Sequence, residues 1–190
     1  DGERSAKLDA AVAAAGWREL RSAAEDGGPW ASGVEAAIVA EELARGLADT
    51  AFLGPTLAAE LRRLTGAPPS DGPETVAFTA DLATLGDAVA VDAAGATSVL
   101  IVTDGRLGSA PLTDGDAGAD LTRPSAGVGS ITPTQHAVTA DTTEGIPTLG
   151  EGLTPAALVG VMRGAVTLAV DYASARKQYG AAVGSFQAVQ

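Results

Sequence analysis

The sequence predicts an α+β chain in which an N-terminal helical domain is followed by a small, barrel-like β domain and the start of a C-terminal helical bundle. Three observations predict this order. Apolar residues recur at helical spacing over roughly the first 65 residues, short β-branched runs begin at Thr75, and helical spacing returns after Thr154. We therefore expect domains at 1–70, 74–150 and 154–190.

Three helices are predicted before the linker at 66–73, which is rich in proline and glycine. Ser32 begins the second helix, because Ser32 and Glu35 have the spacing of a capping box in which each side chain binds a free backbone N–H. The first helix ends at Gly16. The third follows Pro55 and ends at Gly66.

The middle region contains candidate strands separated by turn residues. The clearest is 98–102, a β-branched run between Gly95 and Asp104. The other candidates are 75–79, 88–91, 109–112, 127–131 and 136–139. Short strands with frequent turns predict a small β domain.

A long helix is predicted from Thr154 to about Gln178, with Thr154 as N-cap, Pro155 as its first residue and Gly180 after its end. A further helix is expected to begin at Ser185. The long helix carries one apolar stripe, formed by Leu158, Val161, Met162, Ala165, Leu168, Ala169 and Tyr172. We expect this stripe to face a partner or further residues of the same protein, with 190 residues making about half of a protomer.

Composition excludes several classes of function. The net charge of −12 argues against nucleic acid and against an anionic membrane surface as partners. The absence of cysteine excludes disulfides, thiolate catalysis and cysteine metal sites, and the single histidine excludes multi-histidine sites, so no metal site is predicted. No continuous apolar run reaches a membrane span and no signal peptide opens the chain, so we expect a cytoplasmic location without membrane binding.

Several polar features have structural interpretations. His136 is predicted to lie on the surface, and 127–130 lacks the strand–loop–helix context of a dinucleotide site. The acidic residues at 114–120 lack the glutamate that closes a calcium loop. Glu41 and Glu42 are expected to be solvated or ion-paired, for example with Arg45.

A longer motif lies near the C-terminal end. Residues 171–180 read Asp-Tyr-Ala-Ser-Ala-Arg-Lys-Gln-Tyr-Gly, and the aromatic–glutamine pair Phe186–Gln187 follows six residues after this glycine. The string resembles the acyl-CoA dehydrogenase family at the first long helix of its C-terminal bundle. Three other stretches, 16–28, 39–45 and 118–123, are also similar to segments of that family, so the resemblance covers nearly the whole chain.

The resemblance implies a flavoprotein that desaturates acyl-CoA thioesters, with FAD shared across subunits of a tetramer and electron-transfer flavoprotein as acceptor. By position, Arg176 and Gln178 would contact the diphosphate and adjoining groups, with Tyr179 in the same cofactor-binding segment, and Phe186 and Gln187 would lie near the adenine–ribose end. A guanidinium suits this role because its fixed fork of donors matches a diphosphate.

The sequence departs from the family at the flavin ring and at the catalytic base. The family's Thr-Glu-Pro-x-Ala-Gly-Ser-Asp segment is missing, because residues 76–79 lead directly into Ala80-Asp81-Leu82. No glutamate of the chain matches the base that must stand over the α carbon, so no catalytic residue is predicted. These departures resemble the degenerate subunit of actinobacterial mixed tetramers (α2β2) that act on bulky thioesters such as steroid side-chain CoA.

We therefore expect a chain that is inactive alone and completes the FAD site of a homologous partner. Two alternatives remain. The chain is a fragment of an ordinary homotetrameric acyl-CoA dehydrogenase, or it is an interaction protein that keeps the fold without chemistry.

Overall fold

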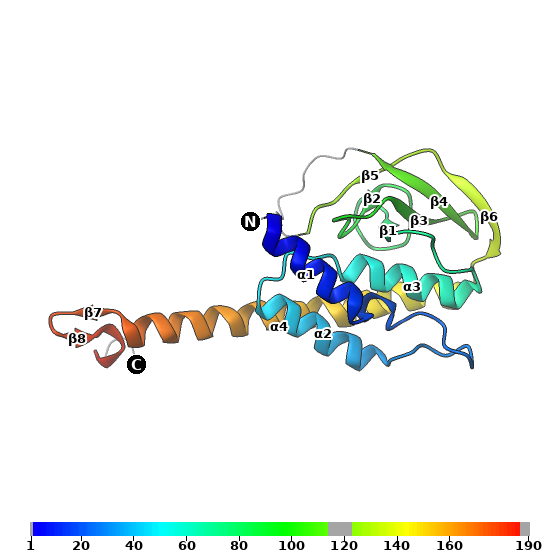
Figure 1. Ribbon diagram of the computed structural model, residues 1–190. Helices are drawn as coiled ribbons and strands as arrows, with labels where there is room; N and C mark the ends of the chain where they lie inside the picture. Colours follow the sequence, from blue (N-terminus) through cyan, green and yellow to red (C-terminus); the bar gives the residue numbers. More distant parts are fainter. Residues whose placement is uncertain (1, 114–122, 187–190) are drawn as a thin grey trace.

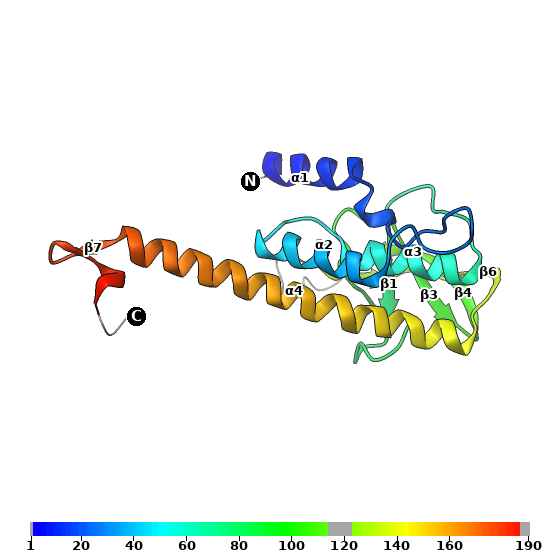
Figure 2. The ribbon, with the colours of Figure 1, turned by 90° about the horizontal axis from the view of Figure 1, so that it is seen from below.

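A helical layer and a curled β-sheet pack against each other along helix α3 (Leu53–Thr65) in the computed structural model, which describes residues 2–113 and 123–186 (Figure 1). The acidic residues at 114–120, most of the 118–123 stretch and Gln187 lie outside the described residues. A single long helix packs beside the other helices of this layer and projects beyond it (Figures 1 and 2).

The three helices expected in the N-terminal domain are present as α1 (Gly2–Ala14), α2 (Gly33–Arg45) and α3 (Leu53–Thr65), with a short 3₁₀ turn, η1 (Trp17–Glu19), after the first. The capping box is confirmed, since the Ser32 hydroxyl accepts from the Glu35 N–H and the Glu35 carboxylate accepts from the Ser32 N–H. Gly66 ends α3 in the left-handed conformation that glycine adopts without strain. α3 begins two residues before Pro55, which sits in its first turn.

Each predicted strand overlaps an observed one. The observed strands are β1 (Glu74–Phe78), β2 (Val89–Ala90), β3 (Ser98–Thr103), β4 (Arg106–Thr113), β5 (Gly127–Val128) and β6 (Thr132–Ala137). The pairing order is β2-β1-β3-β4-β5, with β6 also on β4, and among the described strands β1 and β3 are the one parallel pair. Backbone hydrogen bonds between Ala90 and Ala126 join the two ends of this order, which makes the sheet the nearly closed barrel that the sequence predicts.

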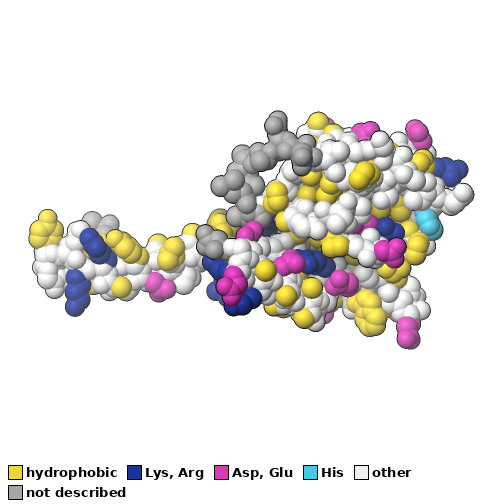
Figure 3. Space-filling view, turned by 45° about the horizontal axis from the view of Figure 1, so that its top comes forward, with side chains coloured by type: hydrophobic (Ala, Val, Ile, Leu, Met, Phe, Trp, Pro, Cys, Tyr) yellow, Lys and Arg dark blue, Asp and Glu magenta, His cyan; other side chains and the backbone are white. Residues whose placement is uncertain are grey.

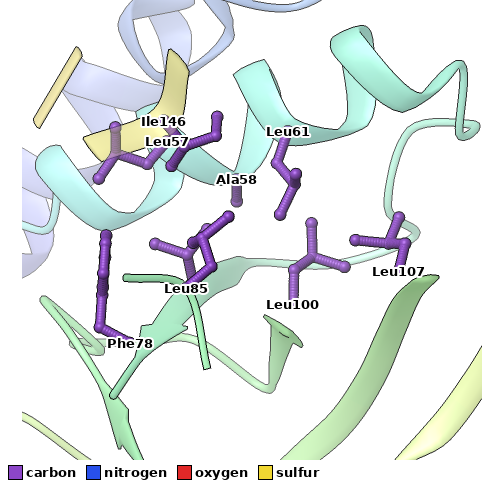
Figure 4. Close-up of a cluster of buried hydrophobic side chains, with 9 residues drawn as sticks. Leu57, Ala58, Leu61, Phe78, Leu85, Leu100, Leu107 and Ile146 are labelled. Carbon is purple, nitrogen blue, oxygen red and sulfur yellow. The ribbon is translucent and has the colours of Figure 1, made fainter. Parts of the chain in front are cut away.

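The main core lies between α3 and this sheet. Leu57, Ala58 and Leu61 of α3 point down onto β1 and β3, where Phe78 and Leu100 meet them (Figure 4). Val76, Leu85, Leu107 and Ile146 complete the cluster. All five residues of β1 are buried, because α3 covers one face of the strand and the barrel interior covers the other.

The predicted start of the long helix at Thr154 is wrong. α4 spans Ala140–Ala175, with Thr139 as its N-cap, so both Pro147 and Pro155 lie inside it. Thr-Pro is a strong local signal for a helix start, but burial outweighs it here, because Ile146 and Leu153 are almost completely buried against the α3 and α2 clusters. The β domain accordingly ends its last strand at Ala137.

α2 and α4 lie side by side (Figure 2) and approach so closely that two helix positions leave no space for a side chain. A Cβ at Gly160 would overlap the backbone carbonyl of Glu41, and one at Gly164 would overlap that of Arg45. On α2 the facing residues are small too, with Ala36, Ala40 and Ala44 buried.

The ion pairs of the helices differ in part from the expected ones. Glu41 pairs with Arg163 of α4 instead of Arg45, and Glu42 takes Arg45 at 2.8 Å. Glu60 of α3 is almost completely buried and receives Arg21 at 2.8 Å and Arg63 at 2.7 Å. Burial alone would raise the pKa of Glu60, but the hydrogen bonds from Arg63 and Arg21 outweigh it and hold this pKa below its ordinary value.

The glycine contact gives a matched pair of variants within one helix. Gly160→Ala should lower the free energy of unfolding by about 1–3 kcal/mol, because the added methyl must push α2 away. Gly152→Ala, where a Cβ meets nothing, should raise it by about 0.5–1 kcal/mol through helix propensity. Denaturant unfolding of both variants measures the difference, and equal effects would contradict the close approach.

The buried carboxylate predicts a pH-dependent stability. Because the pKa of Glu60 is lowered on folding, its contribution is complete above the unfolded pKa, near 4.3, and is lost as pH falls through the folded value. Glu60→Gln should therefore cost about 3 kcal/mol at pH 7, and this cost should shrink below about pH 4. Glu144→Gln, on the exposed face of α4, should change nothing at either pH. If Glu60→Gln lowered the free energy of unfolding by the same amount at both pH values, the charge of Glu60 would not contribute to stability.

Candidate functional site

The motif at residues 176–186 forms a small hairpin at the projecting end of α4. Arg176 follows the last helical residue, and β7 (Lys177–Gln178) pairs with β8 (Ala181–Ala182). Tyr179 and Gly180 make the turn, both with positive φ, which is the requirement of a two-residue type I′ hairpin. The Val183 N–H donates to the Arg176 carbonyl at 2.7 Å, and the 3₁₀ turn η2 (Val183–Ser185) packs back against the end of α4.

The hairpin brings four of the five predicted cofactor residues together. Arg176 and Gln178 lie on one arm, Tyr179 is at the turn with 97% of its surface exposed, and Phe186 follows η2 with its ring half exposed. Gln187, the fifth, is outside the described residues. The helix expected from Ser185 does not begin there, since η2 ends at Ser185 and Phe186, the last described residue, is extended.

The projecting tip of the molecule, which comprises residues 174–180, is exposed and basic. Residues 174–180 are all exposed, and Arg176 and Lys177 are adjacent, whereas the nearest carboxylate in sequence is Asp171 on the helix. The donor set at the tip, a guanidinium, an ammonium and an amide, suits an anion such as a diphosphate. None of the described residues encloses these groups, so a ligand bound there would also need contacts from another protein surface.

The helix that carries the hairpin is apolar on its exposed sides. Leu168 is 72% exposed, and Val166, Val170 and Tyr172 are also exposed. Figure 3 shows hydrophobic side chains along this projection. The predicted stripe at Leu158, Val161 and Met162 is exposed as well. Among the described helices, α4 is the one long and apolar enough to cross a membrane by length and composition, a test that core helices also pass.

The loop between β1 and β2 occupies the place where the sequence lacks a flavin-ring segment. Its polar groups bind one another. The Thr79 hydroxyl donates to Asp81 at 2.6 Å, the Ala83 N–H donates to the same carboxylate at 3.1 Å, and the Thr79 N–H donates to the Thr84 carbonyl at 2.9 Å. The hydrogen bond from Thr79 and that from the Ala83 N–H lower the pKa of Asp81. These donors are therefore already used within the loop.

A cavity of about 430 Å³ lies beside this loop, between α3, the loop and α4. Its walls are apolar, with Leu57, Phe78 and Pro147 among them. Among the described residues that line it, Glu151 is the one titratable group, and it is exposed. Sequence reasoning missed this cavity because its walls come from three separate segments.

Four other glutamates either form ion pairs or face solvent. Glu41, Glu42 and Glu60 are ion-paired, and Glu144 is exposed on α4. Within residues 2–113 and 123–186, no group of three His, Asp or Glu side chains is placed to hold a metal. His136 is partly exposed on β6 and has no described role.

Three solved structures resemble the whole described architecture. A steroid ACAD, the Tcur3481–Tcur3483 G363A variant, aligns with a TM-score of 0.66 at 21% identity, covering 94% of this chain and 60% of that one. The chain has an acyl-CoA dehydrogenase-like fold. The ChsE4–ChsE5 complex from Mycobacterium tuberculosis aligns with a TM-score of 0.64 at 20% identity, covering 99% of this chain and 62% of that chain.

The third structure, FkbI for biosynthesis of the methoxymalonyl extender unit of Fk520, aligns with a TM-score of 0.64 at 17% identity over 99% of this chain and 71% of that chain. The chain thus spans about three fifths of the first structure. No protein-family model and no curated protein sequence matches the chain. The likeness shows the acyl-CoA dehydrogenase-like fold, in which the two helical parts flank the β domain as the sequence predicts.

The hairpin turn can be tested locally. Gly180→Val places a β-branched side chain at a φ of 83° and should cost about 1–2 kcal/mol, which is enough to open a hairpin this short. Amide hydrogen exchange should then speed up at Val183, whose N–H closes the hairpin. Ala181→Val, at a strand position that tolerates branching, should leave this exchange slow. Unchanged protection in Gly180→Val would show that the turn is not formed in solution.

Proposed function

We propose that the chain is the non-catalytic subunit of an FAD-dependent acyl-CoA dehydrogenase, and that its hairpin completes the FAD site of a homologous partner in an α2β2 tetramer. The substrate would be an acyl-CoA thioester, such as a steroid side-chain CoA, and the acceptor electron-transfer flavoprotein. The acyl-CoA dehydrogenase-like fold supports the general class. We place the complex in the cytoplasm.

The observation that carries the proposal is a contrast between two parts of the chain, the hairpin and the β1–β2 loop. The tip offers exposed donors for a diphosphate at Arg176 and Gln178, with exposed aromatic rings at Tyr179 and Phe186. In the β1–β2 loop, by contrast, the Thr79 hydroxyl and the Ala83 N–H both donate to Asp81 within the loop. The donors and rings of the hairpin therefore suit the nucleotide half of FAD and not its flavin ring.

A partner would therefore supply the flavin-ring contacts and the catalytic base. When bound there, the flavin would accept hydride from the β carbon of the thioester. The role of this chain would be to hold the cofactor's diphosphate with Arg176 and to cover its adenine end with Phe186. The exposed apolar surface of α4 supports such an assembly, since an apolar surface of this extent in a monomer marks an interaction site.

A homotetrameric enzyme is the second candidate, and one observation favours it. The chain spans 60% of the steroid ACAD chain, and the remainder could carry the base. The two candidates differ in FAD content. A homotetramer would bind one FAD for each chain without a different subunit, whereas the proposed subunit would bind FAD only in the complex.

The test is co-purification of the full-length protein with its homologous partner, followed by measurement of FAD and of acyl-CoA oxidation. Arg176→Gln should weaken FAD binding by the complex about tenfold or more, through loss of charge-assisted hydrogen bonds. Arg106→Gln, which changes another exposed arginine, on β4, is the matched control and should leave FAD binding unchanged.

Two results would overturn the proposal. One is stoichiometric FAD with dehydrogenase turnover in the purified chain alone. The other is a complex whose FAD affinity is the same in Arg176→Gln and in wild type.

A further inference from the structure

We propose that a second cavity, at the junction of α2, α3 and α4, binds a small, neutral, ring-shaped molecule through a single hydrogen-bond donor given to Asp92. The cavity measures about 160 Å³. It is separate from the hairpin and does not depend on the function proposed above.

The floor of this cavity holds a buried carboxylate with one unused oxygen. Asp92 is 4% exposed and lines the cavity. Its Oδ2 accepts from the Phe52 N–H at 2.8 Å and the Gly54 N–H at 3.2 Å, at the start of α3. Its Oδ1 is buried and receives no hydrogen bond from the described residues. A buried acceptor without a donor costs about 1–3 kcal/mol, so a ligand that donates to Oδ1 recovers that cost.

The walls around Asp92 select for an apolar body. Leu43, Phe52, Leu153 and Val161 line the cavity, and Leu47 and Leu158 are exposed at its edge. An apolar cavity of about 150 Å³ is large enough for benzene, so a space of this size accepts one ring, and the exposed edge leaves room for a fused second ring.

The donor that fits best is neutral. Two backbone N–H groups and the start of α3 already offset the negative charge of Asp92. An ammonium group would have to lose its hydration in an apolar space, at far greater cost than a neutral N–H or O–H. Arg123 also lines the cavity and carries the remaining charge of its wall, which adds to the case against a cation.

Indole and indene test this geometry, because the two molecules share a shape and only indole has an N–H donor. Wild type should bind indole about tenfold more tightly than indene, measured by calorimetry or ligand-observed NMR on the full-length protein. In Asp92→Asn the amide oxygen must serve the two backbone donors, so its NH₂ faces the cavity and the preference for indole should disappear. Asp87→Asn, an exposed neighbour, should keep the preference.

A second variant covers the case in which Asp92→Asn fails to fold. Ala48→Trp fills the cavity from its partly buried edge and should abolish binding of both molecules. Equal affinities of indole and indene in wild type would mean that water alone satisfies Asp92, which overturns the proposal. Undiminished indole binding in Ala48→Trp would also overturn it.

Discussion

The backbone-to-backbone approach of α2 and α4 is the constraint on which the rest of the structure depends. Gly160 and Gly164 let α4 lie directly on α2, with Ala40 and its small neighbours completing the contact. This approach fixes the direction of a helix of 36 residues, so it also fixes where the hairpin at its far end is held. A methyl group at Gly160 would therefore act on the hairpin through about 16 residues of helix.

α4 has two halves with opposite surroundings. The first half buries Ile146 and Leu153 in the body of the protein, and the second half exposes Leu168 and Tyr172. The exposure of so large an apolar surface to water is unfavourable. Its burial against a second protein would stabilise the assembly by about 25 cal/mol for each Å² covered. The same partner would place a second protein surface beside Arg176. One partner would therefore both bury the apolar side chains of α4 and complete the anion site.

Local signals predicted the features that depend on neighbouring residues. The capping box at Ser32, the strand at 98–102 and the helix end at Gly66 each rest on a few adjacent side chains, and the structure contains all three. The start of α4 could not be predicted, because Thr154 and Pro155 are a good helix start that distant burial overrides. Asp92 was missed for a related reason, since its partners at Phe52 and Gly54 are about 40 residues away in sequence.

The candidate cofactor site shows why net charge is a weak guide to the ligand. The chain carries a net charge of −12, which alone would disfavour a diphosphate. Yet exposed charges are screened beyond about 8 Å at physiological ionic strength, so a ligand at the hairpin experiences mainly the charges beside it. The nearest are Arg176 and Lys177, which outnumber Asp171 at the end of a helix that projects from the body of the protein. By holding the hairpin away from that body, α4 gives an acidic protein a locally basic tip, which is the electrostatic condition that the proposed diphosphate contact requires.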